Sequence, residues 1–83
     1  MSEIDRIRWR CRRGTLEMDL LLTRFVEKEY PNLSDEEKQY FSELLDYPDT
    51  DLMNLLVGAT SCLDQNIHAI IEKVRSLHGI SIR

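Results

Sequence analysis

Two arginines, a glycine and two carboxylates stand together near the start of the chain, in Arg12-Arg13-Gly14-Thr15-Leu16-Glu17-Met18-Asp19. No apolar pattern explains this grouping. Charged groups beside a glycine can bind another protein through directed hydrogen bonds, so the stretch predicts recognition rather than catalysis. A helix–helix turn is the alternative, with Gly14 closing one helix and Glu17 and Asp19 complementing the dipole of the next.

Residues that carry enzyme chemistry are scarce. The sequence has no glycine-rich phosphate loop, no Gly-x-Ser-x-Gly elbow and no His-Glu-x-x-His pair. His68 and His78 lie ten residues apart, roughly 80° around a helix and about three turns distant, so they cannot share a metal ion. We expect both on the surface or rim of the last helix. The sequence therefore predicts no catalytic residue and no metal site.

Length and composition limit the architecture to one small domain. The chain has 83 residues, of which 42% are hydrophobic and 31% charged, as in globular proteins. It has no apolar run of the roughly 20 residues that span a membrane, and its amino terminus does not resemble a signal peptide. Cys11 and Cys62 are too few for a disulfide framework. We expect both to be small core residues of a protein that stays in the reduced cytoplasm.

The charges are unevenly distributed along the chain. Residues 1–14 contain five arginines and two acids, whereas residues 27–51 contain nine acids and two lysines. This asymmetry favours oriented docking onto a partner. Nucleic-acid binding by the arginines beside Trp9 is an alternative, but the isoelectric point near 5.1 disfavours binding to a polyanion. The sequence therefore favours a protein partner.

Trp9 falls outside the apolar face of its helix. Ile4, Ile7 and Cys11 form one stripe, and Trp9 lies about 200° around the helix from Ile7. It either packs on another helix or is exposed among arginines, a combination enriched in interface hot spots.

Helical spacing and capping residues predict the first two helices. Ser2 resembles the start of a capping box that opens the first helix, and Gly14 ends that helix. Thr15 is expected to cap a second helix that runs to Tyr30, because Pro31 pushes the preceding residue out of the α region. The apolar residues predicted to face the core from this helix are Leu16, Met18, Leu21, Leu22, Phe25 and Val26.

Three further helices are predicted, the first from the capping box Ser34-Asp35-Glu36-Glu37. The boundaries that follow are a stop at Asp46-Tyr47-Pro48, a cap at Asp49 or Thr50, a stop at Gly58, a cap at Asp64 and a stop at Gly79, with a frayed tail over residues 78–83. No segment alternates as a strand does. The sequence therefore predicts an all-α fold, a small single-domain bundle of five short helices over residues 1–83.

The run Trp9-x-Cys11-Arg12-Arg13-Gly14-x-x-Glu17-x-Asp19 resembles the Arg-Gly-x-x-Glu-x-Asp signature of the succinate dehydrogenase FAD assembly factors. The likeness covers about residues 6–57, and Leu55 stands where the family often has tryptophan. The downstream blocks that share it are Phe25-x-Glu27-x-Glu29-Tyr30, Leu33-Ser34-Asp35-Glu36-Glu37, Phe41-x-x-Leu44-Leu45 and Asp49-x-Asp51-Leu52.

The resemblance implies a five-helix cytoplasmic protein that binds the flavoprotein subunit of succinate dehydrogenase, and of fumarate reductase as well. Such a protein promotes covalent attachment of FAD to a histidine of that subunit. Together, the residues and the resemblance predict a chaperone that is not an enzyme, acts as a monomer, binds no nucleic acid, does not insert into a membrane, and holds no FAD stably, because the FAD belongs to the partner. The partner-facing residues are Arg12, Arg13, Gly14, Glu17 and Asp19. An antitoxin-like regulatory binding module is the alternative.

Overall fold

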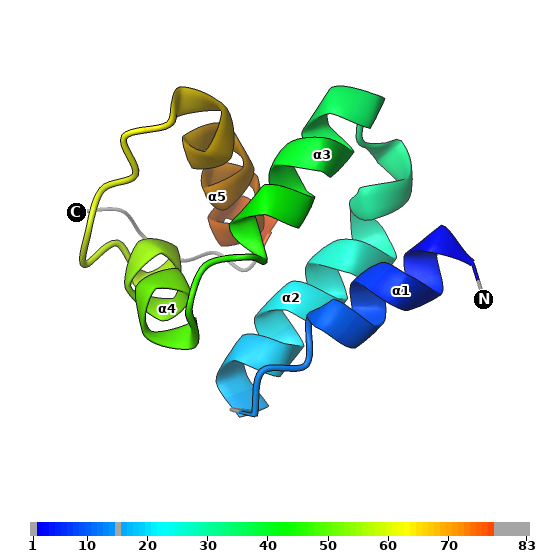
Figure 1. The fold of residues 1–83 in the computed structure, drawn as a ribbon, viewed down its shortest axis with the longest axis horizontal. Helices are drawn as coiled ribbons and strands as arrows, with labels where there is room; N and C mark the ends of the chain where they lie inside the picture. The colour runs from blue at the N-terminus through cyan, green and yellow to red at the C-terminus, as the bar shows by residue number, and fades with distance from the viewer. Residues whose placement is uncertain (1, 15, 78–83) are drawn as a thin grey trace.

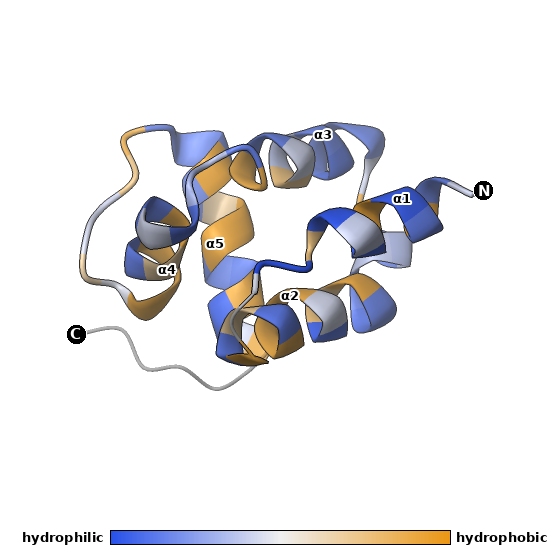
Figure 2. Cartoon of the chain, turned by 60° about the horizontal axis from the view of Figure 1, so that its bottom comes forward, coloured by the Kyte–Doolittle hydropathy of each residue, from blue (hydrophilic) through white to orange (hydrophobic). Residues whose placement is uncertain are grey.

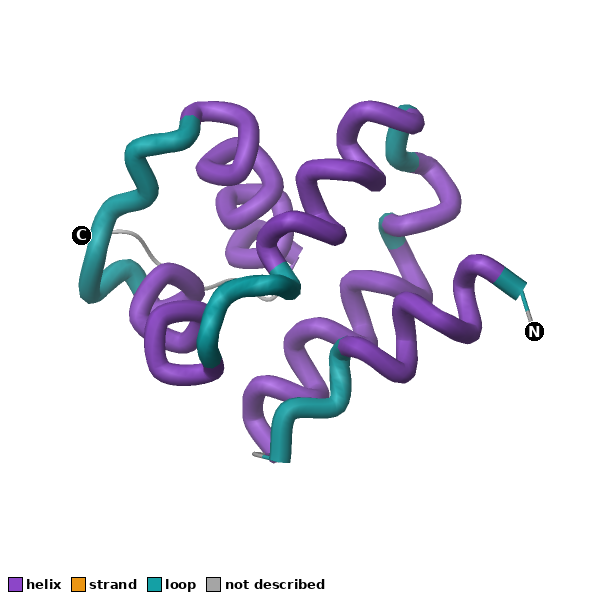
Figure 3. The backbone as a smooth tube through the Cα atoms, viewed as in Figure 1, coloured by secondary structure: helices purple, strands orange, loops and turns teal. Residues whose placement is uncertain are grey.

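The computed structural model describes residues 2–14 and 16–77 as helices joined by short loops. In the described part of the chain there are five α-helices and one 3₁₀ turn, with no strand (Figures 1 and 3). Their bounds are α1 Glu3–Arg10, α2 Leu16–Lys28, η1 Tyr30–Asn32, α3 Asp35–Leu44, α4 Asp49–Val57 and α5 Gln65–Leu77. The prediction of an all-α bundle with five helices is confirmed. The expected tail over residues 78–83 and the Thr15 cap lie outside the described residues.

Helices α2, α3 and α5 enclose the centre of the core, while α1 packs along α2 and α4 packs on α5 (Figure 1). The rings of Phe25 and Phe41 meet with centroids 5.1 Å apart, and Tyr30 lies 5.8 Å from Phe41. Figure 2 shows the apolar sides of the helices turned toward one another. Burial of these side chains is the main force that holds such short helices in place.

Helix α1 begins as predicted but ends earlier. The Ser2 hydroxyl accepts a hydrogen bond from the Asp5 amide, one half of a capping box. The prediction that Gly14 ends the helix is wrong, because α1 ends at Arg10 with Cys11 as its C-cap. A longer helix would direct the Arg13 amide to the Trp9 carbonyl. That amide instead donates to the Asp19 carboxylate, so a side chain from α2 breaks the pattern.

Helix α2 differs from its prediction at its carboxyl end and in the exposure of its first residue. It ends at Lys28 rather than Tyr30, because Tyr30 begins the 3₁₀ turn that contains Pro31. The Tyr30 hydroxyl donates to the Glu3 carboxylate at 2.8 Å, which ties this turn to the start of α1. Leu16 was predicted to face the core but is 74% exposed.

The caps of the later helices are mostly those predicted. Ser34 forms a complete capping box, Gly58 closes α4 with a left-handed φ of 82°, and Asp64 caps α5 by accepting from two amides. The predicted cap of α4 at Asp49 or Thr50 is wrong, since Pro48 occupies the N-cap. The Asp49 carboxylate accepts from Arg13 instead. The predicted stop at Gly79 lies outside the described residues.

Among the described residues, no helix combines the length and the hydropathy needed to cross a lipid bilayer.

Candidate partner-binding site

The bend between α1 and α2 turns at Gly14, which is exposed and has a φ of 87°. This left-handed conformation favours glycine over residues with a Cβ. Apart from its two neighbours in the chain, a Cβ built at this position would meet no atom of the described residues within 4 Å. The glycine is therefore needed for the backbone conformation and not for internal packing, and the space beside it is open to a partner.

Arg13, which precedes this glycine, turns inward. Its side chain is only 14% exposed. One terminal nitrogen, Nη1, donates to the Tyr47 carbonyl at 3.4 Å and to the Asp49 carboxylate at 3.2 Å, and the other, Nη2, donates to the Leu45 carbonyl. The guanidinium thus serves acceptors of its own chain, in the connection between α3 and α4 and at the start of α4.

Arg10 makes a second attachment to the same region. Its Nη1 donates to the Ser42 hydroxyl at 2.6 Å, and its Nη2 donates to the Ser42 carbonyl at 2.9 Å and to the Asp46 carboxylate at 2.6 Å. We call Arg10 and Arg13 with their acceptors in residues 42–49 the arginine clamp. Charge-assisted hydrogen bonds of this kind are stronger than neutral ones, so the clamp joins the end of α1 to the α3–α4 connection.

Ion pairs within the chain neutralise much of the charge asymmetry seen in the sequence. Three of the five amino-terminal arginines pair with acids of the acidic segment: Arg8 with Glu27 at 3.4 Å, Arg10 with Asp46 at 2.6 Å, and Arg13 with Asp49 at 3.2 Å. Much of the asymmetry therefore serves the fold, and less of it remains for a partner than the sequence suggests.

Trp9 and Arg12 lie together on the outer face. Trp9 is 67% exposed, and the Arg12 guanidinium carbon lies 5.3 Å from the centre of its ring. Of the two alternatives for Trp9, the structure shows the exposed one. A stacked tryptophan–arginine pair keeps apolar area and charge available at one point, a combination typical of binding hot spots.

The two acids of the signature have different surroundings. Asp19 is partly buried and accepts a hydrogen bond from the Arg13 amide at 2.5 Å. Glu17, in the first turn of α2, is exposed and makes no ion pair with the described residues. The structure therefore brings Arg13 and Asp19 together and leaves Arg12, Gly14 and Glu17 accessible.

A groove of about 590 Å³ runs between α1 and α2 beside the bend. Its lining combines Trp9 with the exposed Leu20 and with charged side chains; the full set is Asp5, Arg8, Trp9, Arg12, Asp19, Leu20 and Thr23. Leu20 is 53% exposed and was not a predicted site residue. The sequence offers one indication of this exposure. Leu20 directly precedes the Leu21-Leu22 pair that is predicted to face the core, and one helix cannot bury three successive residues equally.

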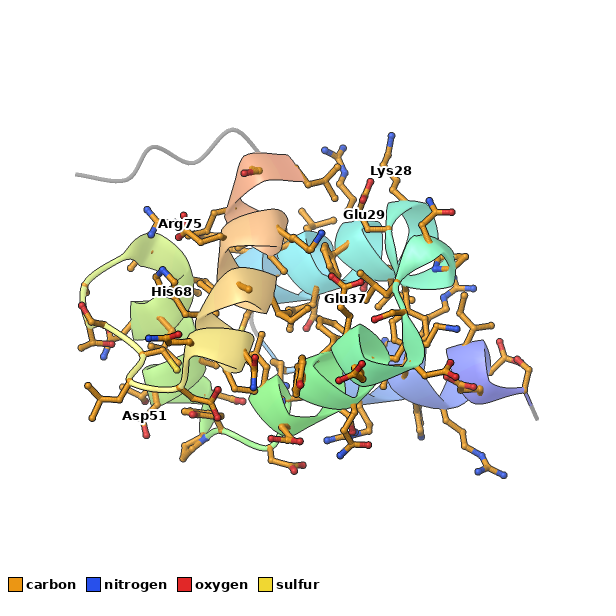
Figure 4. The ribbon with its side chains drawn as sticks, turned by 90° about the horizontal axis from the view of Figure 1, so that it is seen from above. Lys28, Glu29, Glu37, Asp51, His68 and Arg75 are labelled. Carbon is orange, nitrogen blue, oxygen red and sulfur yellow. The ribbon has the colours of Figure 1, made fainter. Side chains whose placement is uncertain are left out.

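The two thiols and His68 have different surroundings. Cys11 is fully buried, and burial raises the pKa of its thiol to about 12 despite the nearby charges of Arg13 and Arg10. Cys62 is only partly buried, so the expectation of two core cysteines holds for Cys11 alone. His68 is exposed on α5 (Figure 4), and His78 lies outside the described residues. No group of three metal-binding side chains occurs within residues 2–14 and 16–77.

Comparison with known proteins gives consistent matches. The family model described as flavinator of succinate dehydrogenase matches residues 5–78. The FAD assembly factor SdhE of Coxiella burnetii is 43% identical over 72 residues, covering 87% of this chain and 88% of that protein. The factors of the same name from Shewanella oneidensis and Yersinia pseudotuberculosis are 40% and 42% identical, covering 90% and 89% of this chain and 92% and 88% of their own lengths.

Proposed function

This chain belongs to the flavinator of succinate dehydrogenase family, and we propose that it binds the flavoprotein subunit of that enzyme and promotes covalent attachment of FAD to a histidine there. The observation that carries the proposal is the family match over residues 5–78, which includes the whole bend between α1 and α2. The exposed surface of this bend and the groove beside it offer a place where the partner can bind.

The partner-binding patch proposed on this chain consists of Arg12, Arg13, Gly14, Glu17 and Asp19. Gly14 leaves open space where a flavoprotein backbone can approach, and beyond its chain neighbours no described residue of this chain comes within 4 Å of that position. Arg12 supplies charged donors next to Trp9, and Glu17 supplies a free acceptor. The patch is thus suited to amide, carboxylate and basic groups across the interface.

The proposed mechanism is stabilisation of one conformation of the flavoprotein subunit. The histidine, the FAD and the bond-forming chemistry all belong to the partner, and this chain contributes binding energy alone. Tighter binding to the reactive conformation than to others shifts the population by a factor of ten for about every 1.4 kcal/mol of difference. A small helical protein with a rigid binding surface can provide such a difference without reacting groups of its own.

Substitution at the bend tests this function. Gly14→Asn keeps a residue type that tolerates the left-handed region but fills the open space with a side chain. We expect this variant to fold, as measured by circular dichroism, and to lose covalent flavin on the dehydrogenase subunit, as measured by fluorescence of denatured gel bands. Wild-type levels of covalent flavin with the folded variant would remove the bend from the proposed mechanism.

A second pair of variants isolates Glu17. Glu17 and Glu36 are both exposed acids in the first turn of a helix, so replacing either with glutamine removes a similar favourable dipole interaction. We expect Glu17→Gln to lower the rate of flavinylation and Glu36→Gln to leave it unchanged. An equal effect of both substitutions would show that helix stability, not the patch, decides activity.

The proposal extends to the partner and the location. We propose that a monomer of this chain acts in the cytoplasm and serves the flavoprotein subunit of fumarate reductase as well. Affinity capture under gentle conditions, followed by flavin fluorescence of the captured bands, identifies which flavoprotein is bound. Capture that consistently lacks a flavoprotein contradicts the proposal, whereas size-exclusion chromatography with light scattering tests the monomer.

A further inference from the structure

We propose that Arg13 acts on the flavoprotein indirectly, as a positioning residue held by Asp49, and not as a residue that contacts the partner. This inference rests on the function proposed above. It assigns a role to Asp49 and to the connection between α3 and α4, and it changes the role of the signature arginine from direct contact to support of the bend.

The first observation is that both terminal nitrogens of Arg13 already have acceptors. Nη1 and Nη2 reach two carbonyl oxygens and the Asp49 carboxylate, and the side chain is 14% exposed. The remaining donor, Nε, is buried and has no hydrogen-bond partner among the described residues. A flavoprotein group that took the place of these acceptors would leave a carbonyl of this chain, that of Tyr47 or Leu45, without its charged donor, which costs stability.

The second observation is that the side chain and the backbone amide of Arg13 both fix the bend. Its side chain is anchored beyond α3, while its amide donates to Asp19 in the first turn of α2. Gly14 follows immediately and carries the left-handed turn. The position of the exposed Gly14 surface therefore depends on where Arg13 is held, and Asp49 supplies the carboxylate that holds it.

The third observation is that two arginines, Arg10 and Arg13, attach the end of α1 and the bend to the same region of the fold. Arg10 binds Ser42 and Asp46 in the same region that Arg13 binds. Two guanidinium groups three residues apart therefore fix the orientation of the chain between them, whereas one would allow rotation. The arginine clamp and the bend form one unit, so loosening the clamp displaces the binding surface without removing any residue from it.

Asp51 provides a matched control for Asp49. Both acids lie in the first turn of α4 and interact with its dipole. Asp51 is exposed and makes no ion pair with the described residues, and Figure 4 places it on the opposite side of the view from α1. Replacing either residue with alanine removes one negative charge from the same helix end, but only Asp49→Ala removes an acceptor of Arg13, its one ion-pair partner among the described residues.

The test is a double-mutant cycle on binding to the purified flavoprotein subunit of succinate dehydrogenase. We expect Asp49→Ala to raise the Kd about tenfold, within the range seen for residues that share partners, and Asp51→Ala to leave it unchanged. The double variant with Arg13→Ala is expected to bind no more weakly than Arg13→Ala alone, because both changes break the same attachment. Asp49→Glu is expected to recover most of the affinity.

Two further measurements separate positioning from stability. Kd is measured far below the melting temperature, so that every variant is folded. The fluorescence of Trp9, the only tryptophan of the chain, is recorded without the partner, because Trp9 and Asp49 line the same surface hollow. We expect Asp49→Ala and Arg13→Ala to change its emission in the same direction, and Asp51→Ala to leave it unaltered.

Defined results overturn the inference. An unchanged Kd for Asp49→Ala, equal effects of the two aspartate variants, or additive effects of Arg13→Ala and Asp49→Ala each contradict the positioning role; additivity shows that one of the pair touches the partner itself. If wild-type protein neither binds nor flavinylates the subunit, the proposed function fails and this inference fails with it. Normal wild-type activity with an additive cycle overturns this inference alone.

Discussion

Gly58→Ala tests whether the buried guanidinium of Arg75 is held rigidly against the end of α4 (Figure 4). Gly58 has a φ of 82° and Gly14 a φ of 87°, so alanine at either position carries a similar conformational cost of roughly 1–2 kcal/mol. Part of that cost is offset, by about 0.4–1 kcal/mol, because alanine also restricts the unfolded chain. We therefore expect Gly14→Ala to lower the free energy of unfolding by about 1 kcal/mol.

The surroundings of the two glycines differ. A Cβ at Gly58 would lie 2.9 Å from Nη1 and 3.0 Å from Nη2 of Arg75, whose side chain is almost fully buried, whereas a Cβ at Gly14 meets nothing within 4 Å. Forcing extra volume into a packed site costs typically about 1–3 kcal/mol. Gly58→Ala is therefore expected to cost about 2–4 kcal/mol in total, a large share of the roughly 4–12 kcal/mol expected for a domain of this length.

Urea unfolding followed by far-ultraviolet circular dichroism measures both values. Trp9 emission is less suitable, since Trp9 is already 67% exposed in the folded chain. In thermal unfolding, each kcal/mol corresponds to about 4–8 °C for a domain of this size. Equal losses for Gly58→Ala and Gly14→Ala would refute the reasoning, because Arg75 would then move aside without cost. The two variants should rank in the opposite order for flavinylation. Gly14→Ala should be the less active variant, whereas the less stable Gly58→Ala variant should remain active while it is folded.

Three further outcomes follow from the caps and thiols. Ser34→Ala should lower the free energy of unfolding by about 1 kcal/mol in urea, because it removes the hydroxyl half of a complete capping box. The hydrogen bond from the Ser34 amide lowers the pKa of Glu37 in the folded chain. The ionised Glu37 carboxylate therefore stabilises the fold above its unfolded pKa of about 4.3, and this stabilisation is lost as the pH falls through the lower folded pKa. Glu37→Gln should accordingly flatten the acid limb of a profile of unfolding free energy against pH. At pH 8, an excess of a thiol reagent should modify the partly buried Cys62 in the folded chain. Cys11 should stay protected until the chain unfolds, because burial raises the pKa of its thiol to about 12. Two fast-reacting thiols in the folded chain would contradict the burial of Cys11.

Local signals predicted most of the helices because they depend on neighbouring residues. The capping box at Ser34 and the cap at Asp64 need only amides up to three residues away. The glycines at positions 14 and 58 both adopt left-handed backbone, the conformation that glycine favours. The sequence also contained the family resemblance, which the match over residues 5–78 confirms.

Side-chain contacts between different segments of the chain explain the errors. Asp49 was predicted as a possible cap of α4, but its carboxylate accepts from Arg13, 36 residues earlier in the chain. The first helix was predicted to run to Gly14, but the Arg13 amide is taken by Asp19. In both cases a polar group had one partner available within its own helix and another in a different segment, and only the packing of the helices shows which is bonded.

The sequence by itself determined the helical segments, the left-handed glycines and the membership of the family, because each of these is expressed in residues that are adjacent or at helical spacing. Only the tertiary structure decided that Arg13 turns inward and that Trp9 and Arg12 remain outside. The physical reason is that a guanidinium binds whichever carbonyl and carboxylate oxygens the fold brings within reach, and those of Leu45, Tyr47 and Asp49 reach Arg13 only after α1, α3 and α4 have packed together.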